Sequence, residues 1–387
     1  IRMPKATAAP GLVNANTTTG MSVPRELLPE VPFTTVLDGF DPSSGAVENA
    51  RRQGVTTLHV LPSRATRISA RGAVLRSSGR YVEEMVVKDS SAIKVTLAPL
   101  PGQSRMEHMA SLRSRFFGLY QRVLKIQEAE DAKKKKAKAL PKTLDGKKEE
   151  RLDAVLKLKP KWSEIRWDDL PLDKISSQDR PLVDLVRGKI PAFVHVDRAS
   201  DIFKAFELID SNGLKATLIL GRDAYKIVDV LAKRKDLGPV LIDPQLVAWE
   251  SDEETGKETR RIPPKIFHEK GVKFALQVIE TRSGRTPTFL MPGEYRFWHQ
   301  AARLVSLGIP RDVALRSITL EPARAMGLEH RLGSIEKGKD ANIVLFSGDP
   351  LDARTWVELV LIEGSVVYKK TDDKDLELIL RRPVRPF

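Results

Sequence analysis

The alternation of apolar strands with amphipathic helices is the feature that most constrains the fold of this chain. Strands that are apolar almost throughout, with helices between them, are typical of a parallel sheet covered on both faces. Together with a weaker strand pattern between residues 68 and 87, the alternation predicts an α/β fold with a closed, TIM-type (β/α)8 barrel. The other predicted strands are 11–16, 54–61, 92–98, 191–196, 216–220, 239–243 and 273–278.

The region 101–188 interrupts this alternation, and we interpret it as a helical, basic insertion within a barrel that spans 8–330. Apolar side chains recur at helical spacing from 103 to 130, which predicts a long amphipathic helix. A lysine-rich stretch follows, and we expect a mobile loop there because like charges repel each other and bury nothing. It offers at most a weak site for an anionic partner, carried by four consecutive lysines: Lys133, Lys134, Lys135 and Lys136.

The composition excludes several classes of protein. The chain has 65 Lys and Arg residues against 51 Asp and Glu residues, a net charge of +14. It has no RNA- or DNA-binding motif, so a nucleic-acid partner is not expected. No cysteine is present, which excludes disulfides, thiol nucleophiles and cysteine-ligated zinc. No apolar run is long enough to predict a membrane span. The compartment stays open, because a leader could precede Ile1.

Four stretches carry a resemblance to a known family. They are PGLVNANTTTG at 10–20, GVTTLHVLP at 54–62, IPAFVHVDRASDI at 190–202 and ITLEPARAMGLEHRLGSIEKGKDANIVLFSGDP at 318–350. Over most of residues 8–369 the chain resembles the amidohydrolase superfamily, and within it the imidazolonepropionase-like branch. The resemblance implies a barrel with a composite β-sandwich, metal ligands at the carboxyl ends of barrel strands, and hydrolysis of C–N bonds in cyclic amides or similar substrates.

The region 331–370 is then expected to form part of the composite β-sandwich, followed by a tail at 371–387. Its strand patterns lie at 341–346, 355–362 and 365–369. Because the first barrel strand begins near residue 11, we expect no room for the strands that precede the barrel in this family. An upstream part of a longer polypeptide, or a strand donated by a partner chain, would then cover the exposed sheet.

The metal motif that this family implies is replaced in this chain. Where the resemblance implies metal ligands, the sequence has residues that bind zinc poorly or not at all: Asn16, Thr18, Leu220 and Ile279. Ionisable residues at or near the other implied positions are the candidates for a catalytic role: His195, Asp197, Glu280 and Lys94, the last near a position where some members use a carboxylated lysine. We therefore expect no metal and assign no catalytic residue; a residual zinc site is the alternative.

Two functions from different classes follow from these substitutions. The first is a pseudoenzyme, a non-catalytic structural or regulatory subunit or domain beside an active homologue, another partner or further copies of itself. The second is an active hydrolase of C–N bonds that uses an unusual, metal-poor site around His195, Asp197 and Glu280. Water activation of the kind this family uses requires a metal and a base, so the substitutions favour the first.

Overall fold

Parallel strands form the centre of the molecule. The structure, a computed structural model, describes residues 6–22, 26–136, 160–252, 254–277, 297–352, 354–374 and 376–377. Two parallel groups of strands are present, one joining β2 to β3 and one running β7-β8-β9-β10-β13. They correspond to the seven apolar runs of the sequence: β2 (Leu12–Thr17), β3 (Val55–Val60), β7 (Ile93–Thr96), β8 (Ala192–Val196), β9 (Ala216–Leu220), β10 (Val240–Ile242) and β13 (Phe274–Leu276).

The predicted closed ring of eight parallel strands is not observed in this part of the chain. The ladders form a six-stranded sheet, β13-β10-β9-β8-β7-β4, and a four-stranded sheet, β2-β3-β5-β6. Strands β4 (Ile68–Arg71), β5 (Ala73–Arg76) and β6 (Val86–Lys88) are antiparallel to their neighbours. Only residues 61–67 connect β3 to β4, which is too short for the crossover that a parallel strand needs.

A single glycine links the two sheets. Gly72 separates β4 in one sheet from β5 in the other. A Cβ atom at this position would lie 2.4 Å from the Leu61 side chain and 2.9 Å from the Val60 carbonyl oxygen, so only glycine fits the bend. On the other side, the backbone N–H groups of Val13 and Leu276 donate to the carbonyls of Ile318 and Ser317. This segment therefore lies between β2 and β13.

Alternate strand side chains face two different apolar clusters. Val13, Phe193, Ile219 and Ala275 belong to an inner cluster, which residues of α11 and the following turn also fill. Their strand neighbours belong to a larger outer cluster covered by helices, as expected for strands buried on both faces. The covering helices are α1 (Gly45–Arg52), α5 (Arg180–Val186), α6 (Ile202–Asn212), α7 (Val228–Lys233), α8 (Pro263–Glu269), α9 (Phe297–Ser306) and α10 (Arg311–Arg316), whereas α11 (Leu320–Ala325) packs in the inner cluster.

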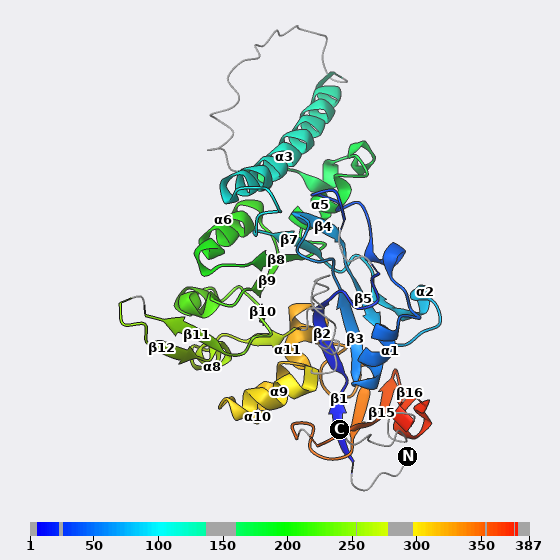
Figure 1. Cartoon of the computed structure of the whole chain (residues 1–387). Coiled ribbons are helices and arrows are strands. Elements are labelled where there is room, and N and C mark those ends of the chain that lie inside the picture. Colours follow the sequence, from blue (N-terminus) through cyan, green and yellow to red (C-terminus); the bar gives the residue numbers. More distant parts are fainter. Residues whose placement is uncertain are drawn as a thin grey trace.

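A small antiparallel sheet lies at one end of the molecule (Figure 1). Its order is β1-β14-β15-β16. Strand β1 precedes the barrel and pairs with β14, which follows it. The expectation that no pre-barrel strand fits into this chain is therefore wrong, because Gly11 alone connects β1 to β2. The strands are β1 (Thr7–Pro10), β14 (Ile343–Phe346), β15 (Val357–Ile362) and β16 (Ser365–Lys369).

Helix α3 (Arg105–Lys136) projects from the opposite end (Figure 1). Its buried side chains include Leu112, Phe116 and Leu119. The helix contains all four lysines of Lys133–Lys136, which we had expected in a loop. Lysine is a good helix former, and positive charge is favoured in a final helical turn. Residues 137–148 of the predicted loop lie outside the described residues. No helix in the described part of the chain is long and apolar enough to cross a membrane.

Short elements connect these larger ones. A two-stranded ribbon follows β10, formed by β11 (Ala248–Ser251) and β12 (Glu258–Arg261). The remaining short helices are α2 (Val82–Met85), η1 (Val36–Gly39), η2 (Trp162–Glu164), η3 (Trp167–Asp169), η4 (Leu172–Lys174), η5 (Ala199–Asp201), η6 (Ala224–Ile227) and η8 (Lys370–Asp372).

Candidate functional site

A chain of side-chain amides joins three strands at their carboxyl ends. Asn16, in β2, donates its amide N–H to Oε1 of Gln277 at 2.7 Å, and Gln277 donates to the Ile242 carbonyl at the end of β10 at 3.1 Å. Both side chains are buried. The Ile242 carbonyl can only accept, which fixes the orientation of the Gln277 amide and then that of Asn16. This chain links β2, β13 and β10 across the gap between the two sheets.

Gln277 was not among the residues singled out from the sequence. It follows β13 directly and lies two positions after Ala275, an inner-cluster residue. Strand periodicity therefore gave a signal, because residues two apart point to the same side. The predicted positions Ile279 and Glu280 lie outside the described residues.

Lys94 is buried in β7, where its Nζ donates to the carbonyl of Pro62. Burial disfavours the charged ammonium and lowers the pKa of Lys94 to about 7. The amine is therefore substantially neutral at neutral pH. This is the residue that the sequence placed near a carboxylated-lysine position.

His195 lies on the next strand and is also buried. Burial lowers its pKa to about 4, and the positive charges of Lys94 and Arg64 add to this effect, so the imidazole is neutral. Its Nδ1 atom is buried without a hydrogen-bond partner among the residues the structure describes. An imidazole nitrogen without a partner is unusual for a buried group.

His59 has a structural role in the same interior. Its Nδ1 donates to the Ala15 carbonyl at 2.9 Å, and its Nε2 accepts from the Ser91 hydroxyl at 2.8 Å. Its ring meets the Phe193 ring edge-on, with 4.8 Å between centroids. Burial lowers the pKa of His59 to about 3. With both nitrogens used, the ring has no free atom for a ligand.

Two aspartates follow strands on this side of the molecule. Asp197, after β8, forms an ion pair with Arg64 at 2.8 Å and is partly exposed. Asp243, after β10, has its pKa raised by burial, an effect partly offset by the nearby Arg222 and Arg64. The sequence analysis did not single out Asp243, although its place at the end of the PVLID strand was a signal.

The other two substituted positions differ in their surroundings. Thr18 is buried just beyond β2. Leu220 belongs to the outer cluster, whereas Ile219 belongs to the inner one. The structure thus places Ile219, and not Leu220, on the inner side of β9. We had expected Leu220 to point into the site, and strand alternation turns it away.

The described side chains do not fit the divalent metal that the family resemblance implies. No group of three or more His, Asp or Glu residues lies close enough to share a metal ion in the described part of the chain. Asn16 directs an amide N–H toward Gln277, whose oxygen already accepts this hydrogen bond. Zinc sites need three or four imidazole, thiolate or carboxylate ligands, and His195 supplies one.

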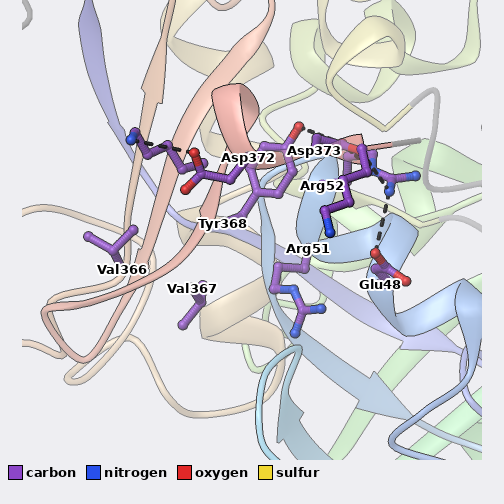
Figure 2. Close-up of a pocket in the computed structure, with 10 residues that line it drawn as sticks. Glu48, Arg51, Arg52, Val366, Val367, Tyr368, Asp372 and Asp373 are labelled. Carbon is purple, nitrogen blue, oxygen red and sulfur yellow. Dashed lines mark hydrogen bonds and ion pairs between the residues drawn. The ribbon is translucent and has the colours of Figure 1, made fainter. Parts of the chain in front are cut away.

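Two pockets in the described part of the chain are similar in size. The first, which we call the mouth pocket, has a volume of about 420 Å³ and lies beyond the carboxyl ends of β3, β7 and β8. It is lined by Ser63, Arg64, Ala65, Ala98, Pro99, Pro101, Arg105, Asp197 and Arg198. The second, the α1–β16 pocket, has a volume of about 430 Å³ and is shown in Figure 2. It is lined by Glu48, Arg51, Arg52, Val366, Val367, Tyr368, Lys369, Asp372, Asp373 and Lys374.

Ion pairs occupy most of the charged groups of the α1–β16 pocket. Arg52 pairs with Glu48 and with Asp373, and the Tyr368 hydroxyl donates to Asp373 at 3.0 Å (Figure 2). Arg51 donates to the backbone carbonyl of Ser77. These contacts fasten the small sheet to α1, and the pocket lies far from the strand ends that hold Lys94 and His195. We therefore take the mouth side as the candidate site.

Comparison with known proteins places this geometry in context. A model of the amidohydrolase family matches residues 199–368. The amidohydrolase tasK of Hapsidospora irregularis is 38% identical over 69 residues, which are 18% of this chain and 7% of that protein. The imidazolonepropionase of Legionella pneumophila (strain Corby) is 32% identical over 91 residues, 24% of this chain and 21% of that protein. Each alignment spans less than a quarter of the relative.

A solved structure matches far more of the chain. The crystal structure of an amidohydrolase from Thermotoga maritima MSB8 superposes with a TM-score of 0.71 and 26% sequence identity, covering 96% of this chain and 91% of that one. The match therefore extends across both sheets of the barrel region and the small sheet.

Proposed function

Because the chain belongs to the amidohydrolase superfamily, we propose that it is a member that has kept the framework and lost the metal chemistry. In this proposal it works as a non-catalytic, pseudoenzyme subunit or domain of a larger assembly. Members of the superfamily hydrolyse C–N bonds. Here the framework would serve a structural or regulatory role.

The amide chain of Asn16, Gln277 and the Ile242 carbonyl carries this proposal. It occupies the carboxyl ends of β2, β13 and β10, the edge at which barrels of this type place their chemistry. Amides neither take up a proton nor bind zinc firmly, whereas water activation needs a metal and a base. The amides instead satisfy one another, so they support the fold at a place where a hydrolase would hold reactive groups.

Helix α3 supports a role in assembly. It projects beyond the barrel region as a 32-residue helix (Figure 1). One side of its outer half contacts residues 164–174 through Gln127, Glu130 and Asp131, whereas Lys125, Glu128 and Ala129 are exposed. A projecting helix gives a partner an accessible surface. An active homologue, another protein or a second copy of this chain would each fit the proposal.

Metal analysis of the purified chain tests the loss of chemistry. We expect well below one zinc per chain, and no cyclic-amide hydrolysis above background after incubation with zinc. The variant Asn16→His should behave in the same way, because one restored ligand leaves the site without the others and without a base. One tightly bound zinc per chain, or zinc-dependent hydrolysis by the parent chain, would overturn the proposal.

A second function rests on a separate observation. Lys94 has a pKa lowered to about 7, and its neighbour His195 has a buried nitrogen without a partner in the described part of the chain. A neutral amine and a neutral imidazole are the forms that act as nucleophile or base. The alternative is therefore a metal-poor hydrolase of C–N bonds, to which Asp197 and Glu280 would contribute. Turnover of cyclic amides that Lys94→Gln and His195→Gln each abolish would support it over the pseudoenzyme.

A further inference from the structure

The lining of the mouth pocket carries more positive than negative side chains. Three arginines line it, Arg64, Arg105 and Arg198, and the single carboxylate in the lining is Asp197. The rest of the lining is small or apolar apart from the hydroxyl of Ser63. Low-dielectric walls strengthen the interaction of a cation with an opposing charge. The lining therefore favours an anion.

Two of the three arginines are held in place by acidic partners. Arg64 uses one amino group for Asp197. Arg105 begins α3 and uses one amino group for Asp201, a buried carboxylate, and for the Ser200 hydroxyl. A guanidinium has five N–H donors in a fixed fork, so both side chains keep donors for a further oxyanion.

The third arginine has no acidic partner among the residues that the structure describes. Arg198 follows β8 directly after Asp197 and is exposed, and it forms no ion pair within the described residues. An exposed arginine without a partner is common at a protein surface. Here, however, it lines a pocket of about 420 Å³ beside two oriented guanidinium groups, and pockets of this size hold small-molecule ligands.

We propose that the mouth pocket binds a small anion carrying carboxylate or phosphate groups, through Arg64, Arg105 and Arg198. Guanidinium groups bind both kinds of oxyanion through paired N–H donors. This inference goes beyond the proposed function, because it requires neither a metal nor a reaction. A chain without metal chemistry would then still bind a ligand beyond the carboxyl ends of its barrel strands, where barrels of this type place their sites.

Calorimetric titration of the full chain at low ionic strength tests the proposal, with inorganic phosphate and succinate as separate probes. We expect saturable binding of at least one probe, at one site per chain. Binding of phosphate alone identifies a phosphate ligand, and binding of succinate alone identifies a carboxylate ligand. Failure of both probes to bind saturably would overturn the proposal.

Three variants locate the binding. Arg198→Gln should weaken it about tenfold or more, the equivalent of one charge-assisted hydrogen bond. Asp197→Asn should tighten it, because the carboxylate competes with the ligand for Arg64. The matched control is Arg260→Gln, an exposed arginine of β12 without an ion pair in the described region. Equal losses in Arg198→Gln and Arg260→Gln would mean that the anion responds only to net charge, which also overturns the proposal.

Discussion

The mouth pocket and the α1–β16 pocket have almost the same volume but use charge in opposite ways. In the α1–β16 pocket, the Asp373 side chain is only 2% exposed and lies 2.7 Å from Nε of Arg52 and 3.0 Å from the Tyr368 hydroxyl. On the mouth side, Lys94 is buried and donates to the Pro62 carbonyl, and Arg198 has no acidic partner in the described region. Paired charges stabilise the α1–β16 pocket, whereas on the mouth side the charge of the buried Lys94 lowers the stability of the folded chain.

The difference teaches that volume alone does not identify a site. A buried charge that is paired with an opposite charge helps to hold its two elements together. A buried charge without such a partner lowers the free energy of unfolding. Buried ionisable groups without an opposite charge beside them occur more often at sites where a ligand binds or a reaction takes place. Four variants test whether the two regions differ in this way.

The largest effect is expected from Lys94→Met on the mouth side. The folded-state pKa of Lys94 lies below that of the unfolded chain, so the unfolded chain binds the extra proton between pH 7 and 10.5. The free energy of unfolding should therefore rise with pH in this window, by about 1.4 kcal/mol per unit from this residue, and fall as pH decreases toward 7. Urea unfolding at several pH values should show that Lys94→Met removes this rise.

The control is Lys233→Met at an exposed position of α7. An unchanged slope in Lys94→Met would show that Lys94 stays charged.

Asp373→Ala should give the next largest effect, in the α1–β16 pocket. Removing one member of a buried ion pair leaves the other uncompensated, which costs about 3 kcal/mol. Chemical denaturation should detect the loss directly. Asp372→Ala changes the adjacent side chain, which is 69% exposed, and should cost less than about 0.5 kcal/mol. Similar losses in the two variants would show that the ion pairs of this pocket do not fasten the small sheet.

Gln277→Ala should lower the free energy of unfolding by about 2 kcal/mol, because it leaves the buried amide of Asn16 and the Ile242 carbonyl without their partner. This would place the amide chain among the groups that hold the fold. The exposed Gln245→Ala is the matched control. If Gln277→Ala is as stable as the parent chain, the amides do not join the two sheets.

The smallest effect is expected from Glu48→Gln. Glu48 pairs with Arg52 at 3.4 Å, but its side chain is 54% exposed, so the pair should contribute below about 1 kcal/mol. Thermal or urea unfolding in low and high salt checks this, since salt screens an exposed pair. A loss equal to that of Asp373→Ala would contradict the division between buried and exposed pairs within this pocket.

Local pattern was enough to predict much of the fold. The seven apolar runs became parallel strands, because a run apolar on both sides can be satisfied only inside a sheet covered on both faces. The stretch ending in the 341–346 strand was enough to indicate the superfamily. Lys94 and His195 lie within β7 and β8, and Asp197 follows β8 directly, as the apolar runs around them indicated.

Strand direction and pairing partners required the tertiary structure. The pattern at 68–87 was counted as the eighth parallel strand of the barrel, whereas the structure has three short antiparallel strands there, β4, β5 and β6. The pairing of β1 with β14 was missed, because the four residues of β1 carry little signal until a distant strand lies beside them. The lysines of α3 were assigned to a loop because repulsion was weighed without the stability of the helix they extend.

The sequence by itself determined which residue types stand where the superfamily resemblance implies metal ligands: an asparagine, a threonine, a leucine and an isoleucine. Only the tertiary structure decided what these residues do. Asn16 meets Gln277 across 261 positions of sequence, Leu220 turns outward while Ile219 faces inward, and three arginines from separate connections line one pocket. The physical reason is that composition and periodicity act over a few residues, whereas hydrogen bonds and ion pairs depend on distances that only the packing of distant segments sets.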